Sequence, residues 1–114
     1  MTIKELQKEV HNIAKEKGWY DKPKSIGEFI ALCHSELSEA LEEYRAGYDV
    51  TAIRIHKIGI TPFYKKEGFP IELADVIIRI LDMAEFYGID LETAIKEKIE
   101  YNRLRSYKHG GKII

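Results

Sequence analysis

The sequence predicts an all-α fold, namely a four-helix up-down bundle with an irregular or short-strand insertion between helices two and three. Residues 1–114 are expected to form this single domain. Apolar residues recur at helical spacing in four segments, and residues typical of helix ends border each segment. Most of the connections are short, as between antiparallel neighbours in a bundle. Together these observations favour helices packed around one core.

The first two helices have clear boundaries. Residues 2–17 carry an apolar face and stop before Gly18, a residue common after helix ends. Ser25 and Glu28 form a Ser-x-x-Glu capping box, which predicts that the second helix begins there and runs to about Ala46.

The last two helices are separated from the first pair by the one long connection. Residues 47–69 could form a short strand pair or a packed loop. The third helix is expected to start near Pro70 and to run to Tyr87, because proline is tolerated in a first helical turn. The fourth should begin after Asp90 as N-cap and continue to about Ser106.

Composition excludes several classes of function. The net charge is −1 and the pI is near 6.4, so no global basic field would attract a nucleic acid polymer or an anionic membrane. No stretch reaches the roughly 18 apolar residues of a membrane span. Cys33 is the only cysteine, which suits a reducing compartment and a packing role. We therefore expect a cytoplasmic protein.

Two acidic motifs interrupt helical stripes that should be apolar. These are Glu36-x-x-Glu39 and Glu72-x-x-Asp75, and residues three apart project from one face of a helix. Buried carboxylates are costly unless they are paired or metal-bound. Oxygen ligands suit Mg²⁺, or Mn²⁺, whereas di-iron bundles use Glu-x-x-His pairs that these motifs lack. The motifs therefore predict a magnesium site.

A third stripe, on the fourth helix, becomes cationic toward its end. It carries Lys98, Asn102 and Arg105 at helical spacing. In an antiparallel bundle this stretch should lie at the same end as both acidic motifs. Cations placed there would face the phosphates of a metal-bound polyphosphate.

Other polar and aromatic residues have two interpretations each. Glu43 extends the acidic edge and is a candidate to support the metal ligands, whereas His34 fits a hydrogen-bonding role at a helix edge. Trp19 and Tyr20 could stack on a nucleobase or plug the turn between the first two helices. Residues 65–68 are typical of a solvated turn, and beside a site entrance they could steer anions.

These motifs resemble those of the all-alpha nucleoside triphosphate pyrophosphohydrolase superfamily, specifically its small MazG-like proteins. The matching stretches are residues 34–43, residues 67–79, the Lys98-x-x-x-Asn102-x-x-Arg105 motif and the tail 107–112. The resemblance implies Mg²⁺-dependent cleavage of a nucleoside triphosphate between its α and β phosphates, which yields a monophosphate and pyrophosphate. A homodimer or homotetramer with sites near subunit contacts is also implied, as is a role in sanitising dNTP pools.

The resemblance also assigns roles to individual residues. The implied metal ligands are Glu36, Glu39, Glu72 and Asp75, with Glu39 as the base, and the implied phosphate or sugar contacts are Lys98, Asn102 and Arg105. One alternative is a non-catalytic helical interaction module that binds a structural cation. Another is a pyrophosphohydrolase of a different substrate, such as a phosphoribosyl nucleotide. The isoleucine-rich segment before the third helix indicates no base preference.

Overall fold

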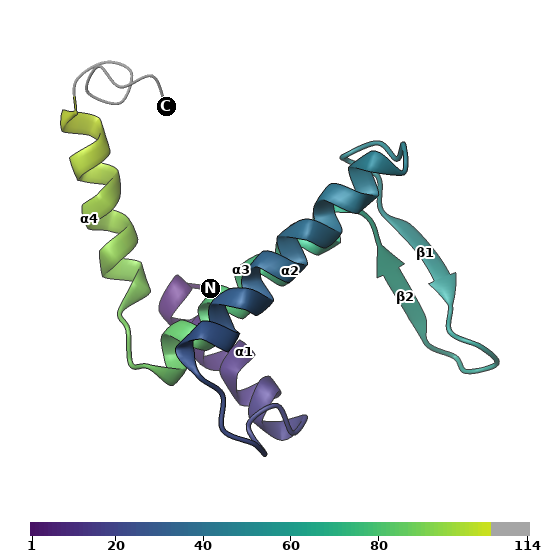
Figure 1. The fold of residues 1–114 in the computed structure, drawn as a ribbon, viewed down its shortest axis with the longest axis horizontal. Helices are drawn as coiled ribbons and strands as arrows, with labels where there is room; N and C mark the ends of the chain where they lie inside the picture. Colours follow the sequence, from purple (N-terminus) through teal and green to yellow (C-terminus); the bar gives the residue numbers. More distant parts are fainter. Residues whose placement is uncertain (106–114) are drawn as a thin grey trace.

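The computed structural model describes residues 1–105, which form four helices and a two-stranded antiparallel sheet (Figure 1). The elements in chain order are α1 (Ile3–Glu16), α2 (Ile26–Arg45), β1 (Arg54–Lys57), β2 (Tyr64–Glu67), α3 (Phe69–Phe86) and α4 (Leu91–Leu104). The four predicted helices are confirmed, and the strand pair is the correct alternative for the long connection. The predicted helix end at Ser106 and the tail 107–112 fall outside the described residues.

Side-chain caps set two helix starts as the sequence predicts. At α2 the Glu28 N–H donates to Ser25 Oγ at 3.2 Å, and the Ser25 N–H donates to Glu28 Oε2 at 2.8 Å. At α4 the Thr93 N–H donates to Asp90 Oδ1 at 3.1 Å. A cap of this kind contributes about 1 kcal/mol by satisfying N–H groups that have no partner within the helix.

Helices α2 and α3 run antiparallel, side by side along their lengths, and α1 packs on α3 (Figure 1). The buried apolar residues are Phe29, Ala40, Leu81 and Ala84. Around Phe29 the rings of Tyr20, Phe86 and Tyr87 pack with centroids 5.0–6.1 Å apart. The core therefore lies between these three helices.

Helix α4 extends away from the α2–α3 pair and contacts α1 near its own start (Figure 1). There the Ile3 N–H donates to Glu92 Oε1 at 3.1 Å. No residue of α4 is buried, and the radius of gyration is 17.3 Å, against about 13 Å for a compact domain of this length. The described part of one chain therefore does not close the predicted four-helix bundle.

The hairpin β1–β2 projects from the end of the α2–α3 pair, with Arg54 opposite Glu67 in its register. Arg54 Nη2 lies 2.9 Å from Glu43 Oε2, which ties the first strand to the end of α2. Gly68 alone separates β2 from α3, and its φ of 137° is one that side chains rarely permit. A Cβ there would also collide with the Ala52 carbonyl oxygen. The hairpin is thus held at a defined angle to α3.

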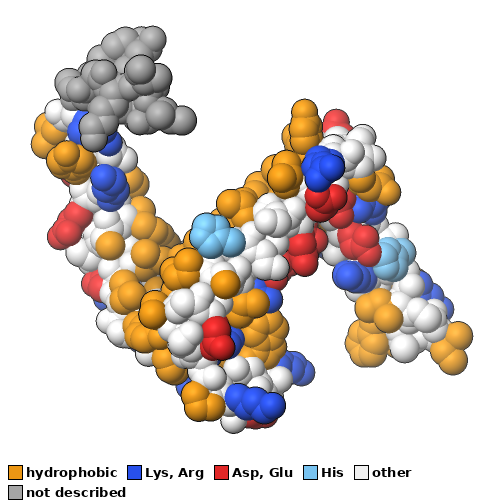
Figure 2. All heavy atoms as spheres, viewed as in Figure 1, with side chains coloured by type: hydrophobic (Ala, Val, Ile, Leu, Met, Phe, Trp, Pro, Cys, Tyr) orange, Lys and Arg blue, Asp and Glu red, His pale blue; other side chains and the backbone are white. Residues whose placement is uncertain are grey.

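One face of α2 is apolar and uncovered. Its five large side chains, each 43–59% exposed, are Ile26, Ile30, Leu37, Leu41 and Tyr44. Hydrophobic side chains gather along this helix and along α4, on both sides of the gap between them (Figure 2). Contiguous apolar surface on this scale is characteristic of interaction sites. Among residues 1–105, no helix is long and apolar enough to cross a membrane.

Candidate metal centre and adjoining cavity

Three of the predicted acidic residues meet between α2 and α3. Glu36, Glu39 and Glu72 each offer one carboxylate oxygen, and these three oxygens lie within 4.8 Å of one another. Asp75 follows Glu72 by one helical turn on the same face of α3. Because α2 and α3 are antiparallel neighbours, the two sequence motifs converge as predicted.

The carboxylates of this cluster are short of positive charge. Burial, followed by a hydrogen bond to Glu39 and the charges of Glu39, Asp75 and Glu36, raises the pKa of Glu72 to about 7. Burial and the Glu36 charge also raise the pKa of Asp75, against the opposing charges of Arg79 and Lys65. One carboxylate oxygen of Glu72 is buried without a hydrogen-bond partner among the described residues.

These features fit a divalent cation. The donor set consists of carboxylate oxygens, which Mg²⁺ and Mn²⁺ prefer. A cation between the two helices would supply the partner that the buried Glu72 oxygen lacks. It would also offset both the burial and the neighbouring negative charges that raise the pKa of Glu72.

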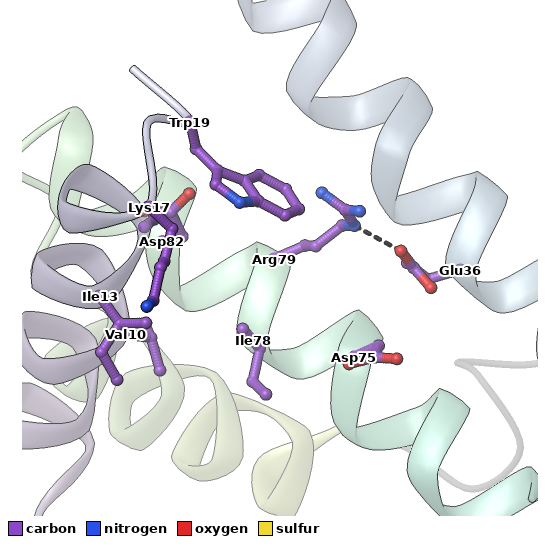
Figure 3. A pocket seen from close by; sticks show the side chains of 10 residues that line it. Val10, Ile13, Lys17, Trp19, Glu36, Asp75, Ile78, Arg79 and Asp82 are labelled. Carbon is purple, nitrogen blue, oxygen red and sulfur yellow. Dashed lines mark hydrogen bonds and ion pairs between the residues drawn. The ribbon is translucent and has the colours of Figure 1, made fainter. Parts of the chain in front are cut away.

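A cavity of about 360 Å³ adjoins the carboxylates, between α1 and α3 (Figure 3). Apolar side chains of α1 and α3 form one part of its wall, and Glu36 and Asp75 form another. The lining residues are Val10, Ile13, Ala14, Lys17, Trp19, Glu36, Asp75, Ile78, Arg79 and Asp82. Its volume is within the range of small-molecule sites, which are mostly apolar with a few polar groups.

Arg79 lies in the wall of this cavity, next to Glu36. Its Nε donates to Glu36 Oε1 at 2.7 Å, and its guanidinium carbon is 4.6 Å from the centre of the Trp19 ring (Figure 3). Trp19 is 46% exposed. The predicted base-stacking residue therefore borders the cavity, with one face of its indole occupied by the guanidinium.

Tyr20 has the other role that the sequence left open. Its hydroxyl donates to Asp82 Oδ2 at 2.7 Å, and its ring stacks on Phe86 with centroids 5.1 Å apart. His11 Nδ1 lies 2.8 Å from the second Asp82 oxygen. Burial and Asp82 together raise the pKa of the Tyr20 hydroxyl well above its usual range. Tyr20 is thus a packing residue rather than a base-stacking one.

Several further expectations have definite outcomes. Glu43 is committed to an ion pair with Arg54, and His34 lines a separate cavity beside Leu37 and Phe69. Cys33 is only half-buried, and burial raises the pKa of its thiol.

Lys65 lies on strand β2, so the prediction of a solvated turn there is wrong. Acidic and basic side chains gather in the recess between the hairpin and the helices (Figure 2).

The predicted convergence of α4 with the acidic motifs is wrong within one chain. Lys98 and Asn102 lie in the second half of α4, which points away from the end of α2 that bears the carboxylates, and Arg105 directly follows that helix (Figure 1). On α4 itself, Lys98 Nζ and the Arg105 guanidinium lie 4.7 and 5.8 Å from the ring centre of Tyr101. The two cations therefore lie close to each other, but they lie far from the acidic cluster of α2 and α3 in the same chain.

The sequence places Arg79 on the acidic face of α3 but assigns it no role in the site, and Asp82 is a site residue that the sequence motifs do not include. Both lie on the stripe of α3 that carries Glu72 and Asp75, because positions 72, 75, 79 and 82 follow the helical repeat. The signal was the continuation of the charged stripe of α3 past Asp75. Following it one turn past Arg79 would have found Asp82.

Comparison with known proteins gives one partial similarity. The chain is 47% identical over 38 residues to a dATP/dGTP diphosphohydrolase of Cyanophage S-2L, and this match covers 33% of the chain and 36% of that protein. No protein-family model matches the sequence. No solved structure matches it.

Proposed function

We propose that the protein is a Mg²⁺-dependent nucleoside triphosphate pyrophosphohydrolase that cleaves between the α and β phosphates and releases a nucleoside monophosphate and pyrophosphate. The observation that carries this proposal is the meeting of Glu36, Glu39 and Glu72 within 4.8 Å, beside a cavity of suitable size for a nucleoside. The partial similarity to a dATP/dGTP diphosphohydrolase supports the same class of reaction.

In this proposal the carboxylates of α2 and α3 hold the metal and the reacting water. Glu36, Glu39, Glu72 and Asp75 would be the ligands, and Mg²⁺, or Mn²⁺, when bound would offset phosphate charge and lower the pKa of the attacking water. Glu39 is exposed, unlike Glu36, so its carboxylate is accessible to a water at the open edge of the cluster. We assign Glu39 as the base that takes the proton.

The adjoining cavity would hold the base and sugar. Its wall from Val10, Ile13 and Ile78 is apolar and suits a nucleobase, whereas Glu36 and Asp75 would face the phosphates. Trp19 stands at the border of the cavity, where an aromatic ring can stack on a base. A triphosphate bound in this way would extend from the cavity toward the metal.

The remaining phosphate contacts would come from a second copy of the chain. Lys98, Asn102 and Arg105 do not lie beside the carboxylates of their own chain, and the apolar face of α2 is uncovered. Packing that face against a partner would bury it and form a bundle from two chains. We propose a homodimer or homotetramer in which α4 of one copy reaches the metal centre of another.

The decisive experiment measures pyrophosphate and monophosphate release from ribo- and deoxyribonucleoside triphosphates with Mg²⁺ and with EDTA. The panel starts with dATP and dGTP. We expect metal-dependent release, lowered at least about 100-fold in Glu39→Gln because a positioned base is lost. Glu42→Gln is the matched control, since Glu42 is on the same helix and pairs with exposed Arg45.

Other outcomes identify the alternatives. Stabilisation by Mg²⁺ without release from any nucleotide would indicate a non-catalytic interaction module. Release from a phosphoribosyl nucleotide, but not from any nucleoside triphosphate, would assign the same chemistry to a different substrate. A normal rate in Glu39→Gln would remove that carboxylate from the mechanism.

A further inference from the structure

Arg79 forms the only side-chain hydrogen bond or ion pair that any of Glu36, Glu39, Glu72 and Asp75 makes with a cationic side chain among residues 1–105. Its Nε contacts Glu36 at 2.7 Å, and both side chains are largely buried, with 20% and 12% of their surface exposed. A charge-assisted hydrogen bond in such a site is strong. Arg79 thus serves as the local counter-ion of the acidic cluster.

The same guanidinium also lies where a bound nucleotide must pass. Arg79 and Trp19 border the cavity, and Glu36 and Asp75 face it as well. A molecule with its base in the cavity and its phosphates at the carboxylates would therefore run directly past Arg79. An arginine at that position can form paired hydrogen bonds with a phosphate.

We propose that Arg79 is an exchangeable counter-ion, which holds Glu36 in the free protein and transfers to the phosphate next to the sugar when Glu36 binds a divalent cation. Only the second step, the transfer of Arg79 to a phosphate, rests on the proposed function. The first step, the release of Glu36 to a cation, concerns only metal binding. The exchange keeps the buried guanidinium paired in both states, which avoids the cost of an unpaired buried charge.

The exchange differs from a purely structural ion pair in a measurable way. A structural Arg79 would support the metal ligand Glu36, so its loss would weaken metal binding or leave it unchanged. An exchangeable Arg79 competes with the metal for Glu36 and repels it, so its loss strengthens metal binding to the free protein. The same loss weakens catalysis, because the phosphate contact is gone.

Trp19 provides a reporter, because it is the only tryptophan of the chain and stacks on the Arg79 guanidinium. The test titrates the full-length protein with Mn²⁺ alone, following both bound Mn²⁺ and tryptophan fluorescence. We expect the fluorescence of the wild type to change as Mn²⁺ binds. In Arg79→Met that change should disappear, and the Mn²⁺ affinity should rise about tenfold, while kcat/KM for a cleaved nucleotide falls about 100-fold.

Two further variants keep the test interpretable. Arg79→Lys retains the charge without the paired-donor geometry, so its Mn²⁺ affinity should stay near that of the wild type although turnover falls. Arg45→Met removes an arginine from the exposed ion pair with Glu42 and should change neither property. Circular dichroism of each variant establishes that it is folded. If Arg79→Met does not fold, the test relies on Arg79→Lys. The inference is then overturned if the Mn²⁺ affinity and fluorescence response of Arg79→Lys differ strongly from those of the wild type.

Unchanged or weaker Mn²⁺ binding in folded Arg79→Met would overturn the exchange, as would a wild-type tryptophan signal that does not respond to saturating Mn²⁺. If Mn²⁺ binds and Arg79 responds as expected but no nucleotide is cleaved, the proposed function fails and the release of Glu36 stands. If nucleotides are cleaved normally by Arg79→Met, the transfer to phosphate is wrong and the proposed function stands.

Discussion

The α2–α3 pair and helix α4 carry similar sequence signals but have different surroundings. Both regions combine an apolar face with a polar stripe, yet every buried residue of the helices lies on α1, α2 or α3, and none lies on α4. The carboxylates of the pair are brought together by packing within one chain, whereas Lys98 on α4 and Arg105 directly after it meet no acidic motif among residues 1–105. A stripe of charged residues therefore indicates a site only when its helix is packed against another.

The largest expected difference between the two regions concerns Glu72 on α3. Glu72→Gln should lower pyrophosphate release by about 100-fold or more, because a metal ligand is lost. It should also raise the melting temperature of the metal-free protein at pH 8 by several degrees, because the substitution removes a buried charge that the neighbouring carboxylates repel. Glu97→Gln on exposed α4 is the control and should change neither quantity. Lower metal-free stability in Glu72→Gln would contradict the repulsion.

If α4 acts on a second copy of the chain, variants of the two regions should complement one another. Arg105→Gln should lower kcat/KM about tenfold, through the loss of one phosphate contact. When inactive Glu39→Gln chains are refolded with Arg105→Gln chains, half of the dimers are mixed and one of their two sites is intact. Activity should therefore recover to about a quarter of the wild-type value. No recovery in mixed dimers would mean that α4 does not act in trans.

A smaller but direct test concerns the apolar face of α2. Leu41 is 53% exposed, so in an isolated chain Leu41→Glu should change the free energy of unfolding by no more than about 0.5 kcal/mol. If a second copy covers this face, the substitution should dissociate the assembly to monomers at micromolar concentration in light scattering. Lys8→Glu, at an exposed position of α1, is a control for the added negative charge. An unchanged mass for Leu41→Glu would place the contact elsewhere.

The smallest expected effect is the pH dependence of the metal-free protein. The pKa of Glu72 is about 7 in the folded state against an ordinary 4.5, so between these values the folded chain binds more protons than the unfolded chain. Its stability should consequently fall as pH rises from about 4.5 to 7, which is the reverse of an ordinary ion-paired carboxylate. Thermal melting of the wild type minus Glu72→Gln isolates this contribution.

Magnesium should reverse the trend, because metal binding requires the deprotonated carboxylates. With saturating Mg²⁺ we expect the melting temperature to rise from pH 6 to 8. A metal-free profile that matches Glu72→Gln across this range would show that burial and the neighbouring carboxylates do not raise the pKa of Glu72.

Much of the fold was predictable because it depends on local chemistry. The capping box at Ser25 and Glu28 and the Asp90 cap act within one helical turn, so their residues alone determine where α2 and α4 begin. The convergence of Glu36, Glu39 and Glu72 was predictable for a related reason. Each motif lies on one face of its helix, and a bundle of antiparallel neighbours brings the end of α2 to the start of α3.

Other features depended on packing between distant segments. Arg79 could be placed on the acidic stripe of α3 from its spacing, but its bond to Glu36 crosses 43 positions of sequence. Trp19 and Tyr20 are adjacent and chemically similar. Only packing against the surrounding helices places Trp19 at the cavity and Tyr20 in the core. Helical periodicity assigns a residue to a face, but it does not specify which neighbour that face meets.

The sequence by itself determined four helices, the residues at which α2 and α4 begin, and two carboxylate pairs whose spacing suits a metal site. The tertiary structure alone decided that α4 leaves the α2–α3 pair, that the long connection forms a hairpin fixed at Gly68, and that Arg79 neutralises Glu36. The physical reason is the distance along the sequence over which each interaction acts. Hydrogen-bonded turns and caps are set by residues three or four positions apart, whereas the direction of a helix follows from which apolar surfaces of the assembled molecule remain to be buried.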